Sequence, residues 1–144
     1  MSGFLLDTNV PSELTRPQPD PVVERWLDQI DDSQVYLSVI SLGELLKGVT
    51  ALPLSKRRVE LDVWINTDLR RWFAGRILPV TERVAERWGV LMGERQVQGR
   101  PVNAIDALIA ATATEHGLAV ATRNVKHFGG LGVSIFNPWD LTLH

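Results

Sequence analysis

The sequence predicts an α/β fold built on a mainly parallel sheet of four or five strands. Three observations lead to this class: short apolar runs recur along the chain, helix-patterned segments separate them, and caps or helix breakers lie between the two. Strands that alternate with helices pair in parallel, and the helices then cover both faces of the sheet. At 144 residues, we expect a single domain that spans residues 1–144.

The amino-terminal part of the chain begins with a buried strand. The apolar run at residues 4–6 predicts this strand, and residues 9–14 predict a short helix that stops before a proline. Asp20 then serves as an N-cap, followed by Pro21 at the first helical position. Apolar residues at helical spacing continue this helix to position 30.

The middle of the chain repeats the strand–helix pattern. Residues 35–40 predict a second buried strand, after which Ser41 opens a helix that a proline ends at position 53. A longer amphipathic helix over residues 55–73 has its apolar residues on one face, and it looks like an insertion with a role of its own, such as subunit contact. Residues 77–80 predict a third strand.

The carboxyl-terminal part of the chain, from Thr81 on, holds two predicted helices and two predicted strands. Thr81 caps a helix that runs to the break at Gly99. Asn103 caps the next helix, which is nearly all small and apolar and should therefore lie centrally, and Gly117 fits its C-terminal cap. The last two strands are expected at residues 118–122 and 133–136.

The composition excludes several classes of protein. With 44% hydrophobic and 22% charged residues, the chain is globular rather than disordered. It has no cysteine, which excludes disulfides, thiolate metal sites and cysteine nucleophiles. A net charge of -2 argues against a protein that binds nucleic acid mainly through a basic surface. No signal peptide and no run of about 18 apolar residues is present, so we expect a cytoplasmic protein without membrane contact.

Polar side chains stand where the predicted strands end. Asp7 follows the first strand, Glu44 follows the second, Asp106 begins the apolar helix and Asn124 follows the fourth strand. The carboxyl ends of parallel strands lie at one edge of the sheet, so these residues should converge there. Converged carboxylates repel unless a cation lies among them. The pattern therefore predicts a divalent-metal site, and the lack of cysteine or paired histidine ligands favours Mg²⁺ or Mn²⁺ over Zn²⁺.

Each of these residues also has an ordinary structural explanation. Asp7 can cap the short helix that follows it. Glu44 and Asp106 each stand three residues after a predicted helix cap, as in a capping box. Asn124 is a common turn residue. Capping and metal binding are compatible because a carboxylate has two oxygens.

Several neighbouring side chains are further candidates for substrate contact. Thr8 and Thr122 could orient the ligands or the scissile phosphate. Arg123 could bind phosphate or be an ordinary surface arginine, and His127 could touch substrate. The five tryptophans are expected mostly in the core or a subunit interface, with base stacking as the alternative for one of them.

Four segments, in this order and spacing, resemble the PIN-domain family, and most closely the VapC and FitB-like toxins of type II toxin–antitoxin systems. They are residues 5–9, 41–45, 103–113 and 121–124. The resemblance implies a PIN-like three-layer α/β/α sandwich. It also implies a Mg²⁺- or Mn²⁺-dependent endoribonuclease that cleaves cellular RNA by attack of a metal-activated water on a phosphodiester.

The resemblance extends to partners and site residues. It implies a homodimer and a cognate antitoxin, which blocks the site and contacts operator DNA in place of the toxin. The family's metal-binding acids match Asp7, Glu44 and Asp106. Its fourth acidic position matches Asn124, which is uncharged, and many relatives have an aspartate where His127 stands. Both departures reduce the negative charge of the site, which leaves room for a first metal ion and argues against a second.

Other functions fit parts of the same pattern. A catalytically weak or inactive PIN-like binding module that acts through an antitoxin would explain Asn124 and His127. A PIN nuclease that acts on single-stranded DNA would use the same acids. A phosphoacceptor or phosphatase domain also places an aspartate at the end of a parallel strand, but it usually needs a second acid beside it, where this chain has Thr8 and Asn9.

Overall fold

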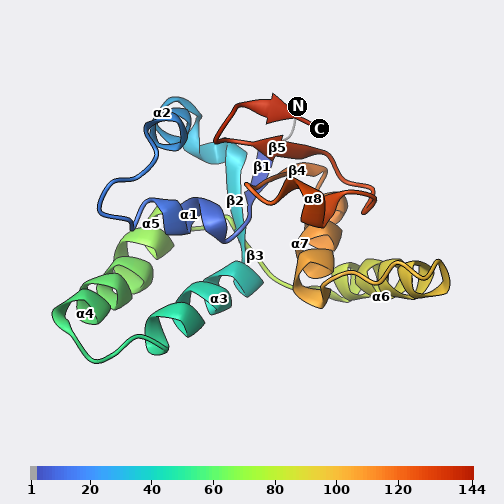
Figure 1. Ribbon diagram of the computed structural model, residues 1–144, viewed down its shortest axis with the longest axis horizontal. Helices are drawn as coiled ribbons and strands as arrows, with labels where there is room; N and C mark the ends of the chain where they lie inside the picture. The colour runs from blue at the N-terminus through green and yellow to red at the C-terminus, as the bar shows by residue number, and fades with distance from the viewer. Residues whose placement is uncertain (1–2) are drawn as a thin grey trace.

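The computed structural model describes residues 3–144 and centres on a six-stranded sheet. Its strands are β1 (Gly3–Leu6), β2 (Val35–Ser38), β3 (Ile77–Leu78), β4 (Leu118–Ala121), β5 (Ile135–Asn137) and β6 (Thr142–Leu143). They lie in the order β3-β2-β1-β4-β5-β6 (Figure 1). The first five pair in parallel, as predicted, and β6 adds an antiparallel edge strand that the sequence analysis did not include.

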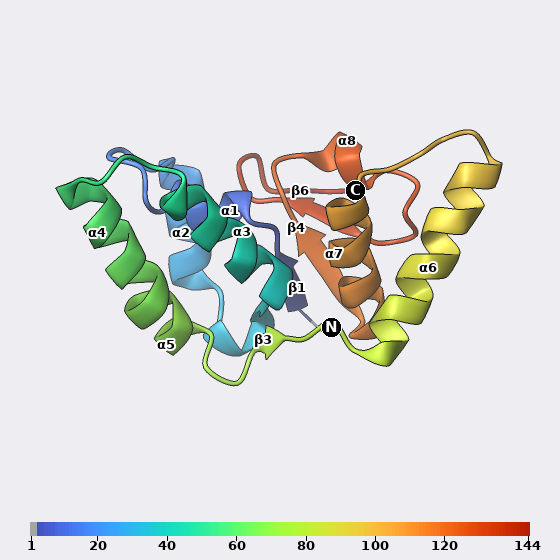
Figure 2. The same ribbon diagram turned by 90° about the horizontal axis from the view of Figure 1, so that it is seen from below.

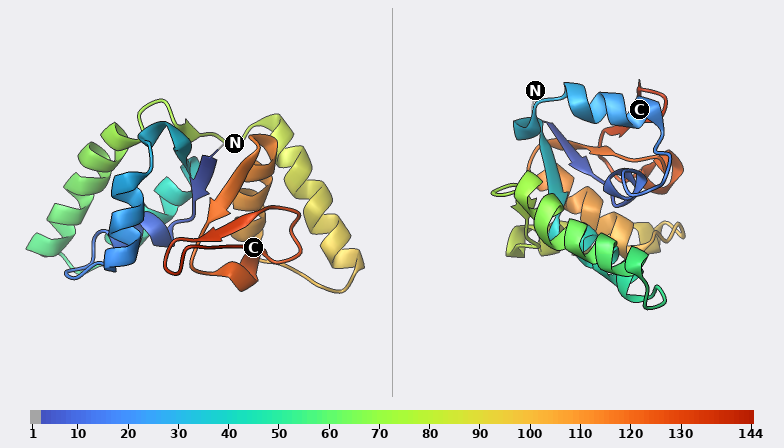
Figure 3. Two further views of the ribbon diagram at one scale, coloured as in Figure 1. Left: turned by 90° about the horizontal axis from the view of Figure 1, so that it is seen from above. Right: turned by 90° about the vertical axis from the view of Figure 1, so that its left-hand side faces the viewer.

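Helices lie on both faces of this sheet (Figure 3), which confirms the predicted α/β sandwich. They are α1 (Asn9–Glu13), α2 (Pro21–Gln29), η1 (Asp32–Gln34), α3 (Val39–Thr50), α4 (Lys56–Val63), η2 (Trp64–Leu69), α5 (Arg70–Trp72), α6 (Glu82–Val97), α7 (Ala104–Glu115) and α8 (Val125–Phe128). The long helix α6 packs on the outer side of α7 (Figure 2). Within the described residues, no helix has the length and apolarity needed to cross a membrane.

The central strand β1 is buried on both of its faces. Leu5 belongs to the core cluster that α7 and α8 complete, whereas Leu6 belongs to the cluster formed with α1, α2 and α3. Adjacent residues of a strand point to opposite faces, so a strand covered on both sides reads as a continuous apolar run. This is why the short segment before Asp7 carries no polar residue.

Three predicted helix caps are present in the structure. The Asp20 carboxylate accepts a hydrogen bond from the Val22 N–H at 2.8 Å. The Thr81 side chain caps α6 in the same way. Asn103 Oδ1 accepts from the N–H groups of Ile105 at 2.9 Å and Asp106 at 3.1 Å. The last cap matters for the site, because it fixes the first turn of α7, which carries Asp106.

The predicted N-cap of α3, Ser41, was wrong by three residues. Strand β2 ends at Ser38, and the Ser38 hydroxyl accepts from the Ile40 N–H at 3.0 Å and caps the helix. Ser41 is therefore a buried helical residue, and its hydroxyl finds no hydrogen-bond partner among the described residues. Glu44 then lies in the second turn of α3, so the capping-box explanation of Glu44 does not hold.

Two other strands differ from their predicted ranges. Strand β3 is shorter than residues 77–80 because Pro79 has no N–H to give to a neighbouring strand. Strand β5 begins two residues later than predicted and ends at Asn137. Both differences lie at strand ends, where apolar composition alone marks the boundary poorly.

The helical segment after Ser55 is continuous but contains a π-helical stretch, η2. Its inward residues Leu61, Ile65, Leu69 and Phe73 are each four positions apart, and all four lie in or against the same core cluster. A spacing of four exceeds the 3.6 residues of an α-helical turn, so these side chains would drift around a regular helix. The wider π turn keeps them on the core face.

We expect Asn103→Ala to lower the free energy of unfolding by about 1 kcal/mol, the usual effect of losing an N-cap. Two backbone N–H groups at the start of α7 would lose their acceptor. Urea denaturation measures the change, and Asn103→Ser, which keeps an acceptor, should stay close to wild type. An alanine variant as stable as wild type would show that the cap contributes nothing.

Candidate active site at the carboxyl edge of the sheet

The order of the strands creates a crevice between the ends of β1 and β4. From β1 the chain builds β2 and β3 on one side, then returns to place β4 and β5 on the other. Ligands of open α/β sheets bind at such a reversal, outside the carboxyl ends of the strands. Asp7 directly follows β1, and helix α7 runs back along the sheet, so that its N-terminal residue Asp106 reaches the same edge.

A cleft of about 300 Å³ lies at this edge. Its lining consists of Asp7, Thr8, Asn9, Ser12, Glu44, Asp106 and Asn124. The structure thus brings together, from four separate segments, the three acids and the asparagine proposed from the sequence, together with Thr8. Two of the predicted residues, Thr122 and Arg123, do not line the cleft.

Asp7 is a buried carboxylate held by hydrogen bonds on both oxygens. Oδ1 accepts from the Thr8 N–H at 2.9 Å, and Oδ2 accepts from the Thr122 hydroxyl at 2.9 Å. Burial raises the pKa of Asp7 above its ordinary value, and the nearby Asp106 and Glu44 carboxylates raise the pKa further. The hydrogen bonds from Thr122 and Thr8 lower the pKa and offset part of this rise.

Glu44 is connected to Asp7 through Thr8. The Thr8 hydroxyl donates to Glu44 Oε1 at 2.6 Å, while the Thr8 N–H donates to Asp7. Thr8 is the N-cap residue of α1, but its side chain makes no capping hydrogen bond. Its hydroxyl therefore orients an acid of the cleft and does not stabilise the helix.

Thr122 is the buried centre of a second network beneath the cleft. Its hydroxyl donates to Asp7 and accepts from the Asn124 N–H at 2.9 Å and from Asn9 Nδ2 at 3.2 Å. Asn9 Oδ1 in turn accepts from the Arg123 N–H at 3.4 Å. Asn9 and Ser12 line the cleft but were not predicted to do so. For Asn9 the available signal was its position two residues after Asp7, but its partner Thr122 lies 113 residues away.

Asp106 faces the cleft from the first turn of α7, where its N–H donates to Asn103 Oδ1 but its carboxylate accepts no hydrogen bond from the Asn103 N–H among the described residues. His127 Nδ1, on α8, lies 3.6 Å from Asp106 Oδ2. Burial raises the pKa of Asp106; the His127 ring lowers that pKa and Glu44 raises it. His127 thus lies beside an acid of the cleft, where its ring partly compensates the negative charge.

The donor atoms of the cleft fit a hard divalent cation. Carboxylate, amide and hydroxyl oxygens line it, and these are the donors that Mg²⁺ and Mn²⁺ prefer. Across residues 3–144, however, no three Asp, Glu or His side chains are grouped closely enough to ligate one ion together. A cation here would take one or two carboxylates as direct ligands and water elsewhere, which is the usual coordination of Mg²⁺ in proteins.

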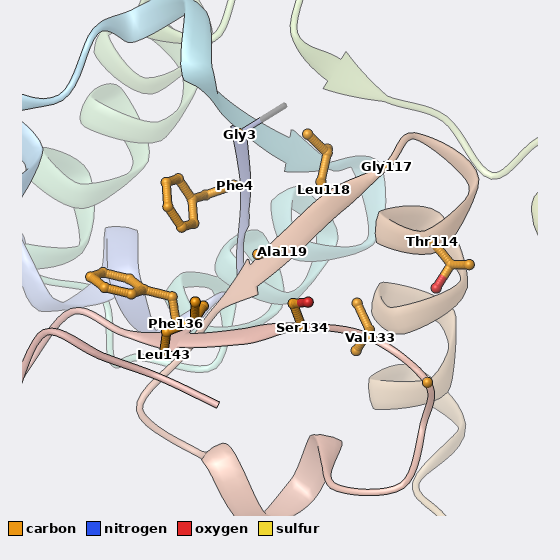
Figure 4. A pocket seen from close by; sticks show the side chains of 11 residues that line it. Gly3, Phe4, Thr114, Gly117, Leu118, Ala119, Val133, Ser134, Phe136 and Leu143 are labelled. Carbon is orange, nitrogen blue, oxygen red and sulfur yellow. The ribbon is translucent and has the colours of Figure 1, made fainter. Parts of the chain in front are cut away.

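A larger cavity of about 600 Å³ lies away from these residues, against β1, β4 and β5 (Figure 4). Phe4, Leu118, Val133 and Phe136 give it an apolar lining. No Asp, Glu, His, Lys or Arg lines it. Size alone therefore does not identify the site of chemistry in this protein.

Comparison with known proteins gives a consistent set of relatives. Residues 4–128 match the model of the PIN domain family. The chain is 43% identical to Toxin FitB of Neisseria gonorrhoeae, over 94% of the chain and 98% of FitB, and 38% identical to VapC ribonuclease Y4jK of Sinorhizobium fredii, over 95% and 98%. A structure of FitAB bound to a DNA fragment superposes with a TM-score of 0.90 at 41% identity, covering 98% of this chain and 99% of that one.

Folding should depend on pH through Asp7 and Asp106. A raised pKa in the folded state means that the folded protein binds protons more tightly than the unfolded chain does. The free energy of unfolding should therefore fall as the pH rises from about 4 through the raised values. Asp7→Asn removes the part of this pH dependence that comes from Asp7. The free energy of unfolding of the variant, relative to wild type, should therefore increase with pH.

The measurement is urea unfolding of wild type and variant at about pH 4 and about pH 7 in the presence of EDTA. Asp31→Asn is a control of opposite sign, because hydrogen bonds from Ser33 lower the pKa of the exposed Asp31. The free energy of unfolding of Asp31→Asn, relative to wild type, should decrease as the pH rises, with most of the decrease at the lowest pH values. A pH-independent difference for Asp7→Asn would contradict the assignment of a raised pKa.

Proposed function

Because the chain belongs to the PIN-domain family, we propose that it is the ribonuclease toxin of a toxin–antitoxin pair. The observation that carries the proposal is the convergence of Asp7, Glu44 and Asp106 on one cleft from β1, α3 and α7. Relatives named as a toxin and as a ribonuclease, similar along nearly their full length, support both halves of the proposal.

In the proposed reaction, Asp7 and Asp106 hold Mg²⁺ or Mn²⁺, and Glu44 acts through a water molecule. The bound cation would activate a water for attack on the phosphodiester and stabilise charge on the phosphate oxygens. Thr8 and Thr122 act on the carboxylates, since their hydroxyls fix the orientations of Glu44 and Asp7. Fixed ligands keep the cleft in its binding geometry before substrate arrives.

The proposed partners are RNA as substrate and an antitoxin as inhibitor. A structure of FitAB bound to a DNA fragment, to which this chain is similar in fold and sequence, supports an antitoxin partner and an assembly that binds DNA. The net charge of -2 agrees with DNA contact through the partner, because a protein that binds nucleic acid mainly through a basic surface usually has a strong positive charge. The homodimer implied by the resemblance would require an apolar contact, and α6 exposes Val90 and Val97.

A second candidate function rests on two residues of the site. Asn124 lines the cleft without a charge, and His127 lies beside Asp106. Both reduce the negative potential that draws in a cation. A PIN-like module that binds metal and antitoxin but cuts RNA poorly is the function these two residues favour.

Asp7→Asn and Asp106→Asn should each reduce RNA cleavage by more than about 100-fold, since losing even an outer partner of a metal ligand lowers activity by about 10–100-fold. The assay is cleavage of total tRNA and ribosomal RNA by the purified chain in Mg²⁺, with EDTA as a second arm. Asp68→Asn, on η2 and outside the cleft lining, is the matched control and should retain activity. Parental cleavage by either cleft variant, or full cleavage in EDTA, would sink the proposal. Metal binding by wild type without RNA cleavage would select the second candidate.

Asn124→Asp should tighten Mg²⁺ binding about tenfold, because one added charge near a dication contributes on the order of 1–2 kcal/mol even when well solvated. Titration calorimetry of wild type and variant measures this. Lys126→Gln raises the negative charge of the same segment by the same amount and serves as the control for net charge. Equal affinity for wild type and Asn124→Asp would mean that this side chain does not approach the cation.

A further inference from the structure

Arg123 and Trp139 form a cation–π pair beside the cleft. The guanidinium carbon of Arg123 lies 5.3 Å from the centroid of the Trp139 ring. We propose that this pair is a phosphate-binding subsite for the RNA strand: Arg123 binds a backbone phosphate next to the scissile one, and Trp139 holds the guanidinium in position. The inference rests on the proposed function. It adds that the RNA strand passes over Arg123 where it leaves the cleft.

The backbone of Arg123 is fixed at the rim of the cleft. Its two sequence neighbours are Thr122, which holds the Asp7 carboxylate, and Asn124, which lines the cleft. Its own N–H donates to Asn9, another lining residue. A phosphate bound by the Arg123 side chain would therefore lie outside the acidic cleft but adjacent to it.

The Trp139 ring that contacts the guanidinium is held in place by packing and by a backbone hydrogen bond. Its ring packs against the core cluster that contains Leu6 and Val10, the residues that flank the cleft segment in sequence. The backbone N–H of Trp139 donates to Asn137 Oδ1 at 2.9 Å, which fixes the backbone after Pro138. The ring is only partly buried, so a face remains for Arg123.

Arg123 is available for an external anion. Its side chain is exposed, and no carboxylate of residues 3–144 lies within ion-pair distance of it. By contrast, Arg83 and Arg87 are both paired with Glu115 at 2.7 Å and 2.6 Å. A guanidinium that stacks through its flat face keeps its N–H edge free for two phosphate oxygens.

The electrostatics of the cleft require such a cation. Three carboxylates line the site, and they repel the phosphates that flank the scissile bond. Arg123 and Lys126 are both exposed cations and stand within two residues of Asn124, which lines the cleft. Stacking on Trp139 restricts the Arg123 side chain before RNA binds. Less conformational entropy is then lost on binding, which strengthens the interaction.

The test measures RNA binding separately from cleavage. Every protein carries Asp106→Asn, so that a bound strand is not cut, and the probe is a fluorescein-labelled single-stranded RNA of randomised sequence in Mg²⁺. Fluorescence anisotropy gives the Kd at salt concentrations from about 50 to 200 mM, and each phosphate contact to single-stranded nucleic acid contributes about 0.7 to the slope of log Kd against log salt. Arg123→Ala should weaken binding and reduce this slope by about 0.7.

Three further variants separate a phosphate contact from a general charge effect. Arg71→Ala, on α5, removes the same charge from an exposed arginine that does not line the cleft and should leave the slope unchanged. Arg123→Lys should restore the slope but only part of the affinity, because an ammonium lacks the planar fork. Trp139→Leu should weaken binding while Arg123 remains, and its thermal unfolding checks that the fold is intact.

Each outcome decides between the alternatives. If neither the Asp106→Asn parent in Mg²⁺ nor wild type in Ca²⁺ binds RNA, the proposed function and the subsite both fail. If it binds RNA and Arg123→Ala has the parental slope, only the subsite is overturned. Equal losses for Arg123→Ala and Arg71→Ala would also overturn it, since the effect would then be one of net charge.

Discussion

The buried carboxylate of Asp7 is the constraint on which the rest of the site depends. A buried ionised group is tolerated only when donors replace the water it has lost, and here the Thr8 N–H and the Thr122 hydroxyl do so. These donors come from the ends of β1 and β4, two strands that lie side by side at the centre of the sheet. The register between β1 and β4 therefore sets the geometry of the acid as well as the core packing.

Two linked networks extend from this carboxylate to the rest of the cleft. Thr8 connects it to Glu44 on α3, and Thr122 connects it to Asn9 and Asn124. In each place a threonine hydroxyl donates to one acid of the cleft. The capped first turn of α7 brings Asp106 from the other side. The cleft is thus held by strand ends and helix termini, which are more rigid than long loops.

The charge distribution of the cleft is a compromise between attracting a cation and accepting a polyanion. Asp7, Glu44 and Asp106 favour a divalent ion. Burial raises the pKa of both Asp7 and Asp106, and neighbouring carboxylates raise them further: Asp106 and Glu44 act on Asp7, and Glu44 acts on Asp106. Asn124 and His127 limit that repulsion on the side nearest α8. The proposed role of Arg123 belongs to the same balance, because a strand that meets three carboxylates needs a cation close by. A chain with a net charge of -2 can bind RNA in this way through local charges alone.

The sequence by itself determined the alternation of strands and helices, the caps at Asp20, Thr81 and Asn103, and the positions of the acids at strand and helix ends. These features depend on side chains acting within a few residues, or on an apolar periodicity that any helix or strand must bury. The tertiary structure decided what those acids touch. Ser38 rather than Ser41 caps α3, Thr8 serves Glu44 and not its own helix, and Asn9 meets a threonine 113 positions away. It also added the edge strand β6 and placed Arg123 on Trp139. Such contacts follow from which strands become neighbours, and strand order depends on the packing of the whole chain, so no local pattern could specify them.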